Sequence, residues 1–166
     1  RTGLLSRFPM RPPPPVIALL VAGGQRALTG PARPYRGRHL LAGVTAGAGL
    51  SLMAAAAWRL HGHRTTIDPV RPSRASALVT DGVYRHSRNP IYVADALMLI
   101  AHAAWLGRPV ALVGLPVFVV AIQPQLRAEA AALAGSFGDD YDSYRSEVPT
   151  WVRSPVRLRP RRQPLR

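Results

Sequence analysis

Residues 91–124 read IYVADALMLIAHAAWLGRPVALVGLPVFVVAIQP, a run that is apolar over most of its length and interrupted at Gly107-Arg108-Pro109. A transmembrane helix needs about 20 residues, so this run is too long for one membrane span. Gly and Pro favour turns and end helices, and they stand near the middle of the run. The sequence therefore predicts two spans, Ile91–Gly107 and Pro109–Ile122, joined as a tight helical hairpin.

Two further apolar segments precede this hairpin. The segment Leu40–Trp58 carries no charge and is long enough to cross a bilayer. Another begins at Val16 and is interrupted by Gln25 and Arg26, so it is the weakest of the four. We expect an all-α integral membrane protein with about four transmembrane helices, followed by a cytoplasmic C-terminal amphipathic helix around Glu129.

The distribution of charge supports this topology. The 166 residues carry a net charge of +14, and arginine alone supplies the basic residues. Seventeen of the 22 arginines lie before residue 12, within 59–90 or after residue 126, which four spans place on one side of the membrane. Basic loops favour the cytoplasmic side, so we expect a bacterial inner membrane location with loop 59–90 and the C-terminus in the cytoplasm. This pattern favours a membrane partner over a nucleic acid.

Three regions are distinguished by composition. Residues 1–15 form a basic, proline-rich lead, residues 16–151 form the membrane domain, and residues 152–166 form a tail rich in Arg and Pro that we expect to be disordered. The chain contains no cysteine, which excludes disulfides and thiolate metal sites. Its histidines lack paired ligand spacing, so we expect no metal site.

The segment 78–94, LVTDGVYRHSRNPIYVA, is too rich in turn formers, tyrosines and arginines to be a mere connector between spans. Pro90 suits the first turn of the third helix. Two later features accompany this segment, namely Glu129 and the stretch FGDDYDSYRSEVPTW at 137–151. In that stretch, the spacing of Tyr141, Tyr144 and Val148 is typical of one packed helix face.

In this order, the three features resemble the isoprenylcysteine carboxyl methyltransferase family and its phospholipid methyltransferase relatives. The resemblance implies S-adenosylmethionine as cofactor, held at the cytoplasmic membrane face, and methyl transfer to the carboxylate of an isoprenylated cysteine or a similar lipid. It implies catalytic roles for Arg88 and Glu129. The implied cofactor contacts are Leu78, Val79, Gly82, Tyr84, Arg88, Asn89, Pro90, Tyr92, Ala94 and Glu129.

The chemistry of these side chains agrees with the resemblance. The carboxylate of Glu129 suits an ammonium group, and the guanidinium of Arg88 suits a carboxylate. Tyr84 or Tyr92 suits an adenine or a sulfonium. A carboxylate acceptor is already a nucleophile at neutral pH, whereas an amine or a hydroxyl needs a base, and the sequence offers no unambiguous one.

Two positions depart from the family pattern. Ala94 stands where the family often has Gly, and Ala130 stands where a second Glu follows the first. Two alternatives therefore stay open, an NADPH-dependent membrane reductase of sterol or isoprenoid double bonds and a non-catalytic membrane adaptor.

Two other pairs of residues have structural or functional interpretations. Asp95 and His102 lie seven residues apart on one helix face within an apolar segment, where ionisable groups are functional candidates. Gly43 and Gly47 form a GxxxG pair, for which we expect close helix packing.

Overall fold

The computed structural model describes residues 12–63 and 77–152, and within these ranges it is helical with no strand. The expected tail and most of the basic lead lie outside the described residues. The elements are α1 (Pro14–Thr29), α2 (Arg38–Gly62), η2 (Gly82–Arg85), α3 (Pro90–Leu106), η3 (Pro109–Val113) and α4 (Gly114–Glu147), where η2 and η3 are short 3-10 helices.

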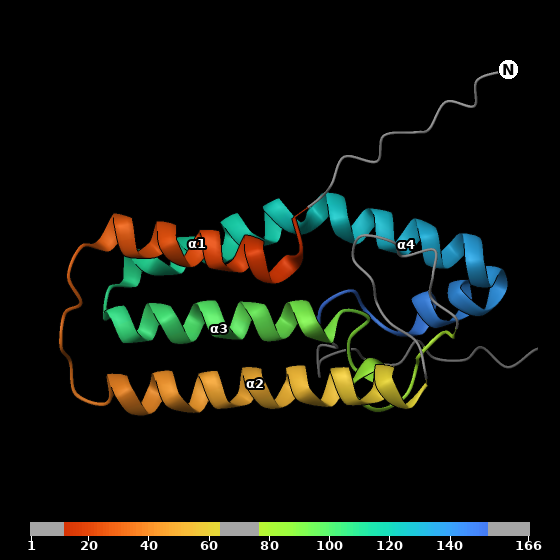
Figure 1. The fold of residues 1–166 in the computed structure, drawn as a ribbon, viewed down its shortest axis with the longest axis horizontal. Helices are drawn as coiled ribbons and strands as arrows, with labels where there is room; N and C mark the ends of the chain where they lie inside the picture. The colour runs from red at the N-terminus through yellow and green to blue at the C-terminus, as the bar shows by residue number, and fades with distance from the viewer. Residues whose placement is uncertain (1–11, 64–76, 153–166) are drawn as a thin grey trace, which may run out of the picture.

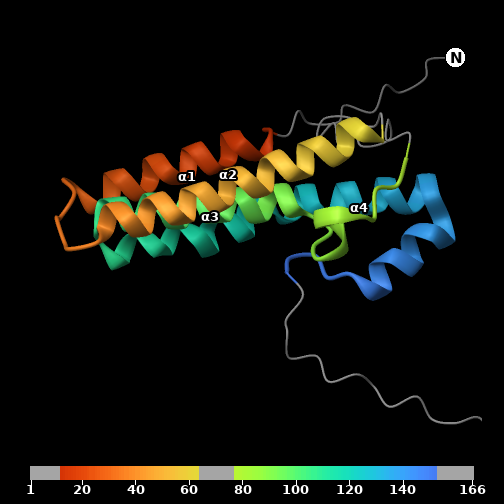
Figure 2. The ribbon, with the colours of Figure 1, turned by 90° about the horizontal axis from the view of Figure 1, so that it is seen from below.

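Helix α3 is the central element of the bundle. It lies between α2 on one side and α1 on the other, and α4 runs beside α1 (Figure 1). Turned by 90°, the same helices form a long bundle, and α4 continues beyond one end of it (Figure 2). The N-terminus of α1, the C-terminus of α2 and the N-terminus of α3 all lie toward that end (Figure 1).

The predicted hairpin between the third and fourth apolar segments is present. Pro90 is at the start of α3, and Gly107 ends the helix in a left-handed conformation with φ 64°. A Cβ at Gly107 would lie 2.1 Å from the carbonyl oxygen of Arg33, so the turn has no room for a side chain. The backbone N–H of Arg33 also donates to the carbonyl of Leu106 at 2.9 Å, which ties the α1–α2 connection to the hairpin.

The fourth span and the C-terminal amphipathic helix, expected as separate elements, are one helix. After the 3-10 turn at η3, α4 (Gly114–Glu147) is continuous through Pro124 and Glu129, and it then kinks at Gly138, whose φ of 49° and ψ of −124° are non-helical, so two helical parts meet there. The expected end at Ile122 is therefore wrong, because Pro124 is accommodated inside the helix instead of ending it. Helix α1 likewise begins two residues before the predicted Val16, because proline is well suited to a first helical turn.

The outer surface fits a lipid environment. Both α2 and the helix from Pro109 to Glu147 are long and apolar enough to cross a membrane, and α3 is a shorter apolar helix. The most apolar part of α2 is only 17% buried inside the protein, unlike the core helix of a soluble protein. Large apolar side chains on the outside include Leu19, Leu20, Leu28, Leu40, Val44, Trp58 and Val120. Such a surface would be costly in water and is favourable in a bilayer.

The GxxxG expectation is wrong for the described residues. A Cβ at Gly43 or at Gly47 would meet nothing within 4 Å. The close approach is instead at Gly49, where a Cβ would lie 3.2 Å from the carbonyl oxygen of Ala94 in α3. Ala94 is fully buried, so a small residue at each of these two positions lets α2 and α3 approach closely.

Gln25, which interrupts the first apolar segment, joins α1 to the hairpin. Its side chain is buried. Its Nε2 donates to the carbonyls of Ala111 at 2.8 Å and Leu99 at 3.3 Å, and its Oε1 lies 2.8 Å from Nδ1 of His102. His102 is thus the partner of Gln25, and the apparent weak point of the segment is a buried hydrogen-bonded contact between helices.

Replacing Gln25 with Leu keeps the side-chain size and removes these hydrogen bonds. We expect the variant to lose about 1–2 kcal/mol of stability, because the carbonyls and the imidazole are left without their partner. Thermal unfolding in detergent measures this loss. Thr45→Val is the control, since Thr45 is only half-buried and its Oγ1 donates to Leu41 of its own helix. Equal melting temperatures for the two variants would contradict the role given to Gln25.

Candidate functional site

Hydrogen bonds attach the segment 77–89 to the C-terminal end of α2. The carboxylate of Asp81 accepts from Nη1 of Arg59 at 2.8 Å and lies 3.2 Å from Nε2 of His63. Gly82 has φ 58°, and a Cβ there would lie 2.6 Å from Nε of Arg59. The ion pair is exposed and adds little stability. The ion pair holds the start of this segment against the end of α2.

The first and third motifs of the sequence are joined by hydrogen bonds. The backbone N–H of Arg88 donates to the carbonyl of Pro149 at 3.0 Å. Nη2 of Arg88 donates to Oγ1 of Thr150 at 2.7 Å, and Nδ2 of Asn89 donates to the carbonyl of Thr150 at 2.9 Å. The segment after α4 therefore lies against the turn before α3, which accounts for the two motifs occurring together.

Two tyrosines of α4 complete this connection. The hydroxyl of Tyr141 accepts from Nη1 of Arg88 at 3.2 Å, and the hydroxyl of Tyr144 donates to the carbonyl of Tyr84 at 2.7 Å. Both tyrosines are buried in a cluster with Val148. The packed face predicted from their spacing is confirmed.

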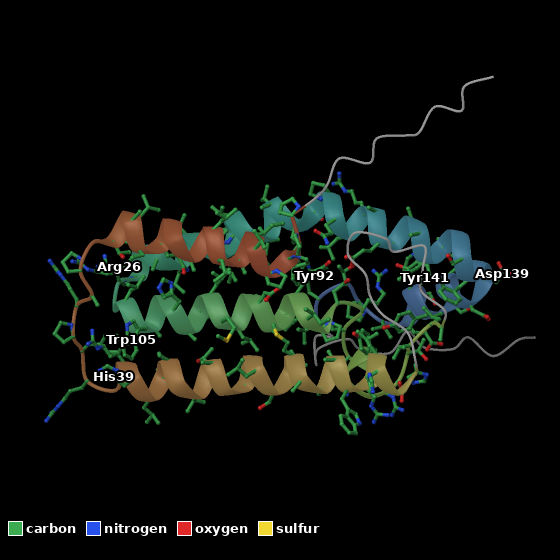
Figure 3. The ribbon with its side chains drawn as sticks, viewed as in Figure 1. Arg26, His39, Tyr92, Trp105, Asp139 and Tyr141 are labelled. Carbon is green, nitrogen blue, oxygen red and sulfur yellow. The ribbon has the colours of Figure 1, made fainter. Side chains whose placement is uncertain are left out.

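Glu129 is the buried carboxylate of the site, with 6% of its surface exposed. The hydroxyl of Tyr92 makes a short hydrogen bond to its Oε1, and Nε2 of Gln125 approaches the same oxygen at 3.4 Å. Two donors on one oxygen fix the orientation of the carboxylate, which leaves its other oxygen for a further partner. Figure 3 shows Tyr92 and Tyr141 toward the end where α3 begins, whereas Arg26, His39 and Trp105 lie at the opposite end.

Two cavities meet at Asn89 and Glu129. The first, called here the guanidinium cavity, has a volume of about 230 Å³, and the second, called the proline cavity, has about 190 Å³. The guanidinium cavity is lined by Arg88, Asn89, Gln123, Leu126, Arg127, Glu129, Ala130, Leu133, Tyr141, Tyr144, Arg145 and Thr150. The proline cavity is lined by Pro14, Pro15, Tyr84, Asn89, Pro90, Ile91, Tyr92 and Glu129.

The two cavities differ in charge. Three guanidinium groups and one carboxylate surround the first, so it has partners for both ends of a zwitterion. The proline cavity has no cation among its lining residues, and Glu129 is its one carboxylate. One cavity thus suits a charged cofactor and the other suits a ligand with an apolar part.

Several buried polar atoms around the cavities lack a partner in the part of the chain that the structure describes. They include Nε of Arg88, Oε1 of Gln125 and the hydroxyl oxygen of Tyr84. Buried polar groups are normally hydrogen-bonded, so such atoms indicate a place for a ligand. Burial raises the pKa of Tyr84, and the neighbouring Tyr144 and Glu129 raise it further. The hydroxyl therefore keeps its proton at neutral pH and is available as a donor.

Six of the ten residues expected from the sequence line the cavities. Arg88 lines the guanidinium cavity, Tyr84, Pro90 and Tyr92 line the proline cavity, and Asn89 and Glu129 line both. The fork of Arg88, expected to hold a carboxylate, contacts Tyr141 and Thr150, and its Nε has no partner among the described residues.

The other four expected residues line neither cavity. Leu78 packs with Tyr141 and Tyr144, and Val79 packs with Ala56 and Tyr84. Gly82 lies against Arg59, and Ala94 lies against α2. These four residues support the segment on which the cavity residues are placed. Asp95 is also buried, and it is absent from the walls of both cavities.

Sequence reasoning missed several residues of the site. Arg127 and Arg145 line the guanidinium cavity, and Pro14 and Pro15 close the proline cavity from the start of α1. The helical register of α4 could have found Gln125, since it lies one turn before Glu129. Nothing in the local pattern of α1 indicates that its first turn reaches the site.

Comparison with known proteins gives a family. A model of the phospholipid methyltransferase family matches residues 37–140 of this chain. An uncharacterized protein of Haemophilus influenzae is 35% identical over 63 residues, which are 37% of this chain and 100% of that protein.

The protein-S-isoprenylcysteine O-methyltransferase of Schizosaccharomyces pombe is 34% identical over 76 residues, which are 45% of this chain and 32% of that protein. No solved structure matches significantly. The family match covers well over half of the chain and includes both Glu129 and the segment 78–94. The chain therefore belongs to the phospholipid methyltransferase family and is a membrane methyltransferase.

Proposed function

We propose that this protein transfers a methyl group from S-adenosylmethionine to a lipophilic acceptor that reaches the site from the bilayer. The observation that carries the proposal is the placement of Glu129. This buried carboxylate is oriented by two donors and lies in the wall shared by a charged and a largely apolar cavity.

The guanidinium cavity fits the amino-acid end of this cofactor. That end carries an ammonium and a carboxylate. The cavity offers the carboxylate of Glu129 and Nε of Arg88, which has no partner among residues 12–63 and 77–152. Charge-assisted hydrogen bonds of this kind are about twice as strong as neutral ones. When bound, the cofactor supplies an electrophilic methyl group, and the residues of the chain bind it, orient it and exclude water.

The two cavities are also of the right size to act together. Binding sites for small molecules are typically about 300–1,000 Å³, and each cavity alone is smaller than that. A cofactor in one cavity and the head group of a lipid in the other would meet beside Asn89 and Glu129. This arrangement favours a group transfer between two ligands over a reaction of one ligand with water.

For the acceptor, we propose the carboxylate of an isoprenylated cysteine or a similar lipid. A carboxylate needs no base, and the relative from Schizosaccharomyces pombe is named for this substrate. A phospholipid amine is the second candidate, supported by the family description. In that case Glu129, the one carboxylate in the shared wall, would take the proton from the amine, and the ammonium of the cofactor would need another partner.

We also propose a bacterial inner membrane location with the site on the cytoplasmic side. Pro90, which lines the proline cavity, begins α3, and α3 begins at the end of the bundle where α2 ends (Figure 1). The sequence between these two helix ends is rich in arginine. Basic segments favour the cytoplasm, and the soluble cofactor would enter from there.

Replacing Glu129 with Gln tests the cofactor assignment, because the variant keeps the shape and removes the charge. Hydrogen bonds to charged groups contribute about 1.5–3 kcal/mol, so we expect S-adenosylhomocysteine to bind about ten- to a hundredfold more weakly. Calorimetric titration of the detergent-solubilised protein measures the affinity. Asp139→Asn is the matched control, since this exposed carboxylate is absent from both cavity walls. Unchanged affinity in the Glu129 variant would refute the assignment.

Replacing Ala130 with Glu tests whether the missing second carboxylate limits the enzyme. Ala130 lines the guanidinium cavity, so a carboxylate there would face the same ligand as Glu129. We expect S-adenosylhomocysteine to bind several-fold more tightly and methyl transfer to continue. Ala130→Gln, of equal size and neutral, is the control. An absence of methyl transfer from both the natural protein and Ala130→Glu would support a non-catalytic adaptor instead.

A further inference from the structure

The proline cavity joins the start of α1 to the start of α3. Pro14 and Pro15 form the first turn of α1, and Pro90 and Ile91 form the first turn of α3. Helix α1 continues from this turn with exposed Leu19 and Leu20, which are 71% and 69% exposed. The cavity is therefore continuous along one helix with a surface that suits lipid chains.

Tyr84 is the unusual residue of this cavity. Its side chain is 2% exposed, it lines the cavity, and its hydroxyl oxygen has no hydrogen-bond partner among the described residues. A phenylalanine would pack equally well, so an unpartnered buried hydroxyl is a cost that needs a compensating interaction. A ligand in the cavity that accepts a hydrogen bond would provide it.

The charged groups in their walls indicate that the two cavities bind different ligands. The amino-acid end of the cofactor carries both a carboxylate and an ammonium, and only the first cavity, lined by guanidinium groups as well as Glu129, has partners for both. A carboxylate acceptor in the second cavity would have the sulfonium of the cofactor as its cation. The second cavity offers the hydroxyl of Tyr84, the amide of Asn89 and the Glu129 carboxylate that Tyr92 contacts, and the rest of its wall is apolar. A lipid head group with an oxygen or nitrogen lone pair matches this set, and its tail matches the apolar surface of α1.

Building on the function proposed above, we propose that the proline cavity is the acceptor site and that the hydroxyl of Tyr84 donates a hydrogen bond to the lipid head group. Tyr84 is then a specificity-determining residue that orients the acceptor beside Glu129. The sequence had suggested a cofactor contact for this tyrosine. Its location opposite the prolines of α1, in the cavity without cations, assigns it to the acceptor instead.

Tyr84→Phe tests this assignment, because the ring is kept and only the donor is lost. The full-length protein in detergent is first titrated with S-adenosylhomocysteine. The saturated protein is then titrated with three lipid probes, an S-farnesylcysteine, a short-chain phosphatidylethanolamine and a free fatty acid. We expect at least one probe to bind the natural protein, to bind Tyr84→Phe about three- to tenfold more weakly, and S-adenosylhomocysteine to bind both equally. Tyr35→Phe, a change at a tyrosine absent from both cavities, is the control.

A second pair of variants acts on the volume of the cavity. Ile91→Phe should fill part of the proline cavity and weaken the same probe, whereas Ile91→Val should leave its binding intact. Both variants should bind S-adenosylhomocysteine normally, since Ile91 does not line the guanidinium cavity.

The outcomes separate this inference from the function on which it rests. Failure of the natural protein to bind S-adenosylhomocysteine would refute the proposed methyl donor. With that binding intact, equal probe affinities for Tyr84→Phe and the natural protein would overturn the acceptor assignment. Weaker binding of S-adenosylhomocysteine to Tyr84→Phe, or no binding of any probe to the natural protein, would overturn it as well.

Discussion

The buried carboxylate of Glu129 is the constraint on which the site depends. A carboxylate is costly to bury unless donors are arranged around it. Tyr92 from α3 and Gln125 from the preceding turn of α4 provide donors to one oxygen. This contact couples the positions of α3 and α4, and both cavities open at the place where it is made. The hairpin at Gly107 brings these two helices together, so the turn far from the site also determines its geometry.

Buried backbone groups, like the buried carboxylate, need hydrogen-bond partners, and this explains the many backbone contacts near the site. The segment 77–89 contains only one short helix, so its carbonyl and N–H groups need other partners. The residues after α4 supply them through Pro149 and Thr150, and Tyr144 reaches the carbonyl of Tyr84. Motifs about sixty residues apart in sequence thus lie together and contribute Arg88 and Arg145 to the lining of the guanidinium cavity.

The sequence predicted the features that depend on composition and local turns, and it failed where distant segments meet. The apolar runs, Pro90 and Gly107 located the α3–α4 hairpin, because hydrophobic length and turn residues are local signals. The order and spacing of the three sequence motifs identified six residues that line the cavities, including Glu129. The contribution of Pro14 and Pro15 depends on how α1 packs against α3, which no periodicity encodes. Gln25 looked like an interruption of the first apolar segment, because its hydrogen-bond partners lie 74 and more residues away in the chain and no local pattern reveals them.

The most direct test of the account is a calorimetric titration of the natural protein in detergent with S-adenosylhomocysteine, with NADPH as the comparison ligand. The account predicts micromolar binding of the first ligand and no binding of the second. Binding of NADPH alone would contradict the account and indicate a reductase. Binding of neither ligand would remove the basis for a cofactor site at Glu129.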